Sequence, residues 1–93
     1  MTYSIDKNII AKSINHYGEE IQATVCMEEC AELIQAISKM KRGIDAKDNL
    51  AEEIADVLIC IEMLKPLYNV QDLDVESWIM QKQQRVMDGM KEA

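Results

Sequence analysis

Apolar and polar residues alternate along this chain with the three-to-four-residue period of amphipathic helices. The pattern predicts four helices, at about residues 5–17, 19–42, 48–64 and from 72 or 74 to 90. Gly18 and Gly43 are expected to end the first two helices, and Asp48 to cap the start of the third. The Lys65-Pro66 step is expected to break or kink that third helix. Since no segment shows sustained strand-like alternation, the sequence predicts an all-α, four-helix antiparallel bundle.

Two of these predicted helices carry paired carboxylates among their apolar residues. Each pair is spaced three residues apart, which places both acids on one helix face: Glu29 with Glu32, and Glu53 with Asp56. At about 100° of rotation per residue, the first acid of each pair falls inside the apolar arc and the second falls at its margin. A lone carboxylate in an apolar stripe is costly unless it is paired or coordinated. The two helices are therefore predicted to have the same arrangement, with one acid in the apolar arc and a second acid at its margin.

Packed side by side, two such helices would bring four carboxylates to one place. A bare cluster of this kind would repel itself, so it requires bound cations. Oxygen-only ligands favour Mg²⁺ or Mn²⁺ over zinc. The alternative interpretation is that these acids are solvated residues on amphipathic helices. That interpretation suits Glu19 and Glu62, but it explains Glu29 and Glu53 poorly because both fall in apolar arcs.

The fourth predicted helix carries a basic pair in the equivalent position. Lys82 falls inside an arc that also holds Trp78 and Val86, and Arg85 falls at its margin. One interpretation is that the lysine extends along the apolar stripe to keep its ammonium group in water. The other is that Lys82 and Arg85 contact the phosphates of an anionic substrate held by the metal ions.

Length and charge restrict the class of protein further. Ninety-three residues predict a single domain, 1–93, and a chain this short buries only about 60–65% of its unfolded surface, which favours self-association. The net charge of −7 argues against a nucleic-acid polymer as partner. The charge does not exclude a free nucleotide as partner, because bound divalent ions reverse the local electrostatic field.

The cysteines and the chain termini predict a protein of the reduced cytoplasm. Cys26, Cys30 and Cys60 are odd in number and fall in helical apolar sectors, which is typical of core thiols. The first residues lack the apolar run of a signal peptide, and no stretch approaches the about 20 apolar residues of a membrane span. We therefore expect a soluble, cytoplasmic protein with no membrane partner.

The acidic motifs carry a resemblance to a known family. Glu28-Glu29-x-x-Glu32 and Glu53-x-x-Asp56, within residues 27–36 and 49–59, resemble the signature of the MazG-like, all-α nucleotide pyrophosphohydrolases. The resemblance implies a bundle of the all-α NTP pyrophosphatase type, assembled as a homodimer or homotetramer. It also implies Mg²⁺-dependent hydrolysis of nucleoside or deoxynucleoside triphosphates to monophosphate and pyrophosphate by a metal-activated water.

The resemblance also assigns roles to individual residues. It implies metal ligation by four carboxylates, Glu29, Glu32, Glu53 and Asp56. Among the acids it implies direct catalytic roles for Glu28, Glu29 and Glu53, with Glu28 orienting the attacking water or a ligand. It implies phosphate binding by Lys82 and Arg85, and it places Gln22 in the nucleotide pocket.

Three other hypotheses remain at this point. A phosphoribosyl-ATP pyrophosphatase of the same superfamily shares the fold and the acidic motif. A dinuclear iron bundle requires Glu-x-x-His pairs, and the chain has a single histidine, His16, so it is nearly excluded. An acidic helical interaction module without chemistry is the third, and it should gain no thermal stability from Mg²⁺.

Overall fold

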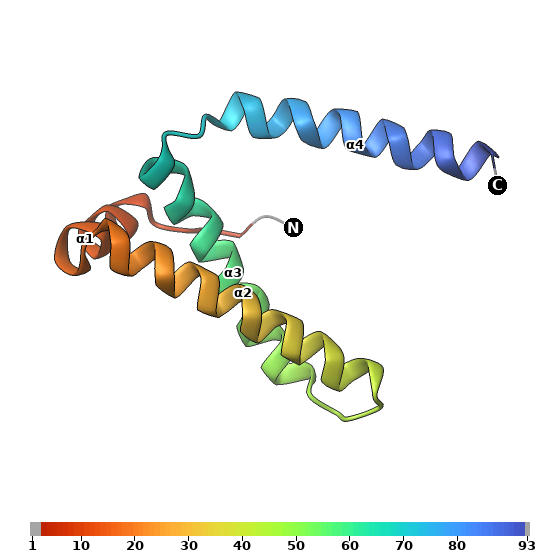
Figure 1. The fold of residues 1–93 in the computed structure, drawn as a ribbon, viewed down its shortest axis with the longest axis horizontal. Coiled ribbons are helices and arrows are strands. Elements are labelled where there is room, and N and C mark those ends of the chain that lie inside the picture. The colour runs from red at the N-terminus through yellow and green to blue at the C-terminus, as the bar shows by residue number, and fades with distance from the viewer. Residues whose placement is uncertain (1–2, 93) are drawn as a thin grey trace.

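The computed structural model describes residues 3–92, which form four helices and no strand (Figure 1). The helices are α1 (Lys7–Tyr17), α2 (Glu19–Lys41), α3 (Lys47–Tyr68) and α4 (Asp72–Glu92). The predicted all-α class is confirmed, and so is the number of helices within the described residues. None of these helices is long and apolar enough to cross a lipid bilayer.

Local chemistry sets the boundaries of the first two helices. The Asp6 carboxylate accepts a hydrogen bond from the Asn8 amide at 2.8 Å and so caps α1. Gly18 ends α1 at φ 94°, a value that favours glycine, and its N–H donates to the Ile14 carbonyl at 2.8 Å. The same glycine directly precedes α2, so the two helices meet at one residue. Gly43, at φ 80°, follows the end of α2 as the sequence predicted.

The third helix starts within one residue of the predicted position, but its predicted cap and its predicted end were wrong. The helix begins at Lys47 after Ala46, which makes no capping hydrogen bond, so Asp48 lies in the first turn and is not the cap. An acid there still interacts favourably with the positive end of the helix dipole. Pro66 neither ends nor breaks the helix, which continues to Tyr68 although the proline donates no backbone hydrogen bond. The helix ends instead at Asn69, which adopts the left-handed conformation.

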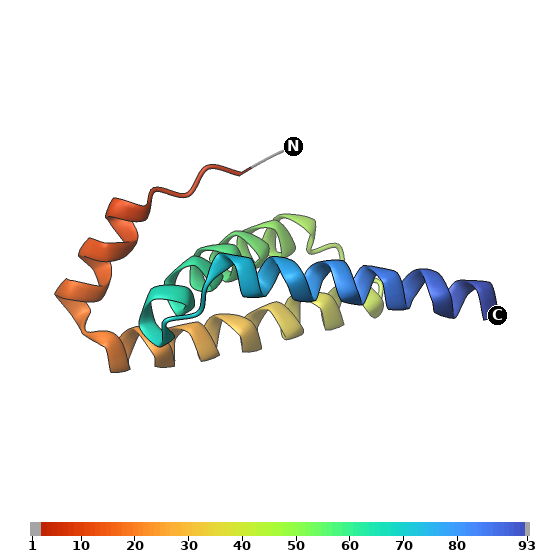
Figure 2. The same ribbon diagram turned by 90° about the horizontal axis from the view of Figure 1, so that it is seen from above.

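The core lies where α1 crosses the antiparallel pair formed by α2 and α3, here called the acid hairpin, residues 19–68 (Figures 1 and 2). Its buried residues are Ile10, Cys26, Cys60 and Met63. The Cys26 thiol donates to the Cys60 carbonyl at 3.8 Å, and burial raises the pKa of the Cys60 thiol to about 12. Cys26 and Cys60 are thus core thiols as predicted, whereas Cys30 is exposed.

Helix α4 runs apart from the acid hairpin after a turn at the end of α3 (Figure 1). The turn is fixed by the Val70 N–H, which donates to the Lys65 carbonyl at 2.9 Å. The Lys65 ammonium group then joins Glu62 on α3 to Asp72 at the start of α4, at 2.8 Å to each carboxylate. Within one chain, therefore, three helices pack together and the fourth does not close the bundle.

The separation of α4 leaves the chain with a large exposed surface. Within residues 72–91 every side chain is exposed except that of Val75, which is half-buried. The accessible surface is 7621 Å². A folded monomer of this mass exposes about 5,500 Å², so the excess is about 2,000 Å².

Candidate metal centre

The four predicted carboxylates converge in the middle of the acid hairpin. Glu29 and Glu32 on α2 and Glu53 and Asp56 on α3 each offer one oxygen, and these four oxygens all lie within 4.8 Å of one another. Glu53 is buried at 5% exposure, Glu29 and Asp56 are half-buried, and Glu32 is exposed. The three-residue spacing and the antiparallel packing of two similar helices account for this convergence.

Proximity and burial make the cluster resist ionisation. The close Asp56 carboxyl, partial burial and the neighbouring negative charges together raise the pKa of Glu29 to about 7. Burial, followed by the close Glu32 carboxyl, raises the pKa of Glu53 above its ordinary value. Carboxyl groups that share a small volume cannot all be charged at neutral pH without a compensating cation.

Two buried oxygens of the cluster have no hydrogen-bond partner within the described residues. They are Oε2 of Glu29 and Oε2 of Glu53. Buried polar atoms are nearly always satisfied, so these carboxylate oxygens are suited to bind a cation. In an octahedral Mg²⁺ site the ligand oxygens lie up to about 4.2 Å apart, which the present spread nearly matches. The donor set, the spacing and the orphaned oxygens therefore fit Mg²⁺ or Mn²⁺.

Asn49 belongs to the site although the sequence gave it no role. Its Nδ2 donates to Oε1 of Glu53 at 3.5 Å, from one turn earlier in α3. The bond holds the carboxylate through one oxygen and leaves the other free to bind a cation. The four-residue spacing between Asn49 and Glu53 was the available signal, because such residues are neighbours on a helix.

Two other predicted site residues lie outside the four-carboxylate cluster. Glu28 is exposed on α2, next in sequence to Glu29. Gln22 is buried at 6% exposure, and its Oε1 accepts a hydrogen bond from the Ser13 hydroxyl at 3.2 Å. That bond gives Gln22 a structural contact, the joining of α1 to α2.

The structure does not bring the predicted basic pair to the cluster of its own chain. Lys82 and Arg85 lie on α4, which runs apart from the acid hairpin (Figure 1). Both cations instead approach the ring of Trp78, at 5.8 Å from its centroid. Trp78 is 52% exposed, so these cation–π contacts are weak.

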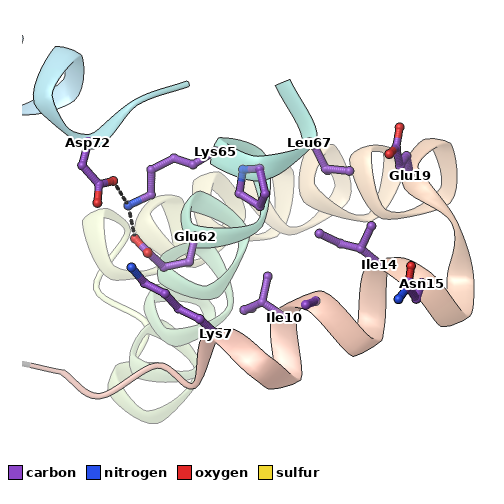
Figure 3. Close-up of a pocket in the computed structure, with 11 residues that line it drawn as sticks. Lys7, Ile10, Ile14, Asn15, Glu19, Glu62, Lys65, Leu67 and Asp72 are labelled. Atoms are coloured by element: carbon purple, nitrogen blue, oxygen red, sulfur yellow. Dashed lines mark hydrogen bonds and ion pairs between the residues drawn. The ribbon is translucent and has the colours of Figure 1, made fainter. Parts of the chain in front are cut away.

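A groove of about 480 Å³ lies elsewhere, between α1, the end of α3 and the start of α4 (Figure 3). Its floor is apolar, with Ile10 and Ile14 facing Leu67, and it includes none of the four clustered carboxylates. At its rim Lys65 is already paired with two acids. The groove has room for a small ligand, and of its polar groups Lys65, Glu62 and Asp72 already satisfy one another.

The fold and the cluster together define an all-α protein whose antiparallel helix pair presents four converging carboxylates. The chain belongs to the MazG nucleotide pyrophosphohydrolase domain family, whose model matches residues 18–88. The matched segment includes all the predicted site residues and confirms the resemblance seen in the acidic motifs. No curated protein and no solved structure matches the chain.

Proposed function

We propose that the protein hydrolyses nucleoside or deoxynucleoside triphosphates to a monophosphate and pyrophosphate, with Mg²⁺ as cofactor and Mn²⁺ as a substitute. The observation that carries this proposal is the pair of buried oxygens, on Glu29 and Glu53, that have no hydrogen-bond partner in the described part of the chain. Membership of the nucleotide pyrophosphohydrolase family supports the reaction class. The orphaned oxygens support the cofactor, because they fit the ligand set of a hard divalent cation.

In this proposal Glu29, Glu32, Glu53 and Asp56 hold the metal. Once bound, Mg²⁺ supplies charge neutralisation for the phosphates and lowers the pKa of a water molecule. Asn49 donates to Oε1 of Glu53 and would help to orient this ligand. The raised pKa of Glu29 means that protons compete with the metal below neutral pH.

The remaining residues act on water and phosphate. Glu28 is exposed beside Glu29 and accepts a hydrogen bond from the attacking water, which orients it. A bond forms between the water oxygen and the α-phosphorus while the bridging bond to the β-phosphate breaks, and the water proton passes to solvent. Pyrophosphate leaves with the electron pair, and Lys82 and Arg85 offset its charge. Gln22 would border the nucleotide from the buried side of α2, in addition to its contact with Ser13.

A homo-oligomer is part of the same proposal. The surface excess of about 2,000 Å² exceeds the about 800 Å² that each partner buries in a standard interface. The exposed apolar side chains of α4 include Trp78, Ile79 and Val86. Burial of this face against a second copy would add to the small core of the single chain. The formal charge of −7 keeps nucleic-acid polymers out of the set of partners.

The test is a chromatographic assay of the purified protein with Mg²⁺ and each ribo- and deoxyribonucleoside triphosphate. We expect monophosphate and pyrophosphate in equal amounts, abolished by a chelator. Release of diphosphate and phosphate would contradict the bond assignment. If none of them is turned over, phosphoribosyl-ATP is the next substrate to assay, because a pyrophosphatase for it would use the same acids. An interaction module would show no turnover and no stabilisation by Mg²⁺.

A further inference from the structure

We propose that Cys26 and Cys60 form a reversible disulfide bond between α2 and α3 when the chain meets a hydroperoxide. This goes beyond the proposed function, because it concerns two thiols that metal binding and hydrolysis do not use. It assigns a redox-controlled covalent bond to the core of the acid hairpin.

The two thiols face each other across the hairpin. Cys26 on α2 and Cys60 on α3 are both free, at 3% and 5% exposure. The Sγ atom of Cys26 lies 3.8 Å from the Cys60 carbonyl oxygen. Burial, followed by the close Cys26 thiol, raises the pKa of the Cys60 thiol, so the two sulfur atoms are themselves neighbours. A disulfide requires such facing positions, because a pair that points apart cannot be joined without moving the backbone.

The register of the two helices accounts for this contact. The Glu29 carboxyl on α2 lies close to that of Asp56 on α3. A step of three residues back along α2 leads to Cys26, and a step of four residues forward along α3 leads to Cys60. Each step is about one helical turn, so the antiparallel helices bring the cysteines together one turn away from the acids. The packing that gathers the carboxylates therefore also pairs the thiols.

An apolar hollow between α2 and the end of α3 gives an oxidant access to Cys26. Its volume is about 500 Å³, and Cys26, Cys30, Leu64 and Tyr68 are among its lining residues. The described residues that line it do not include Cys60. Cys30 is exposed, but it follows Cys26 by one turn of the same helix, where both side chains project from one face and do not point at each other. The thiol that faces Cys26 is therefore that of Cys60.

The reaction balances with hydrogen peroxide as the oxidant. The Cys26 sulfur attacks one peroxide oxygen, the O–O bond breaks, and the second oxygen leaves as water, which makes Cys26 a sulfenic acid. The Cys60 sulfur then bonds to the Cys26 sulfur and displaces the remaining oxygen as a second water molecule. The two thiols lose two electrons and both of their protons, and the peroxide is reduced. A small thiol such as dithiothreitol reverses the change by exchange.

The bond would restrain the chain where the acid hairpin turns. It closes residues 27–59 into a loop, and this segment contains all four clustered carboxylates. Restraint of such a loop in the unfolded chain raises the melting temperature by about 10 °C. In the oxidised chain α2 and α3 are therefore held together whether or not a metal is bound.

The test uses a Cys30→Ser chain, which keeps the two buried thiols and removes the exposed one. The folded chain is treated with hydrogen peroxide, the peroxide is destroyed with catalase, and the chain is unfolded and alkylated. We expect no alkylation of either cysteine, and a cross-linked peptide that joins α2 to α3 after proteolysis. Dithiothreitol should restore two labels per chain. The control is Cys30→Ser/Cys60→Ala, which should give no such cross-link.

Three results would overturn the proposal: two labels per chain after peroxide, Cys26 oxidised beyond sulfenic acid with Cys60 still free, or a cross-link between two copies. A second readout is the melting temperature of the oxidised Cys30→Ser chain in chelator. It should be about 10 °C higher before dithiothreitol than after it. An equal or lower value would contradict the restraint of the hairpin. Neither readout measures nucleotide hydrolysis, so the result does not depend on the proposed function.

Discussion

The Asn49 side chain contacts Oε1 of Glu53 at 3.5 Å, while Oε2 of the same carboxylate is buried without a hydrogen-bond partner among residues 3–92. The two oxygens of one side chain thus have different roles, one anchored and one free. Substitution of Glu53 and substitution of Asn49 should therefore have different effects on metal binding.

Replacement of Glu53 by Gln should reduce nucleotide hydrolysis by about 100-fold or more, because a buried charge that holds the metal is removed while the shape is kept. Stabilisation by Mg²⁺ should also disappear, whereas the metal-free variant should melt no lower than the wild type, since repulsion in the cluster is relieved. Steady-state rates and thermal melts with and without Mg²⁺ measure both effects. Glu52→Gln, one residue earlier and exposed, is the matched control. Wild-type turnover in Glu53→Gln would remove the cluster from the mechanism.

The metal-free protein should become less stable as the pH rises from about 4.5 to about 7. The pKa of Glu29 is raised from 4.5 to about 7 in the folded state, so the folded chain binds more protons than the unfolded chain in this window. The melting temperature in chelator should therefore fall by about 5 °C or more across it. Burial of Glu53 acts in the same direction. A melting temperature that rises with pH between these values would contradict the assigned environment.

Saturating Mg²⁺ should remove most of that pH dependence near neutrality. A ligand at 100 times its dissociation constant stabilises by about 2.7 kcal/mol, which corresponds to roughly 10 °C or more for a domain of this size. The shift should be larger at pH 8 than at pH 5.5, because protons compete for the same oxygens. Equal shifts at the two pH values would mean that the ion binds elsewhere.

Replacement of Asn49 by Ala should weaken Mg²⁺ or Mn²⁺ binding about tenfold, since residues that orient metal ligands contribute 10–100-fold. The effect should be seen by calorimetric titration and should appear in activity only at low metal concentration. Gln35→Ala, an amide lost from an exposed position on α2, is the control. An unchanged metal affinity in Asn49→Ala would mean that Asn49 does not orient Glu53.

Replacement of Lys82 and of Arg85 by Met should each raise KM for the nucleotide about tenfold, because each charge-assisted contact to phosphate is lost. Methionine keeps the long apolar stem that the α4 face needs for packing. Lys91→Met, which removes a cation from the end of the same helix, should change KM little. If all three variants behave alike, the effect is one of net charge.

The sequence predicted the helices of this fold better than their ends. Gly18 and Gly43 were foreseen because each requires a backbone conformation that favours glycine. Pro66 misled the prediction because a proline disfavours a helix without always ending it, and α3 continues to Tyr68. The separation of α4 could not be foreseen, since an amphipathic pattern states that a face is apolar but not which chain covers it.

In the candidate site, too, the features set by local sequence were predicted better than those set by tertiary structure. Spacing and helical phase brought the four carboxylates together correctly, because a three-residue interval fixes a helix face whatever the tertiary context. The hydrogen bond from Asn49 to Glu53 was not predicted, although the four-residue interval between them can be read from the sequence. The distance between the basic pair and the cluster depends on a turn at Asn69, which no local pattern of charges encodes.

Because the three thiols differ in exposure, their rates of alkylation can report separation of the helices. Cys30 is exposed in the single chain and can react with an alkylating reagent, whereas Cys26 and Cys60 are buried and the pKa of Cys60 is raised to about 12. The native chain should therefore take up one label quickly and two slowly. The rate of the slow phase would measure how often α2 separates from α3. The decrease of that rate in Mg²⁺ would measure how much the metal stabilises the contact between the two helices.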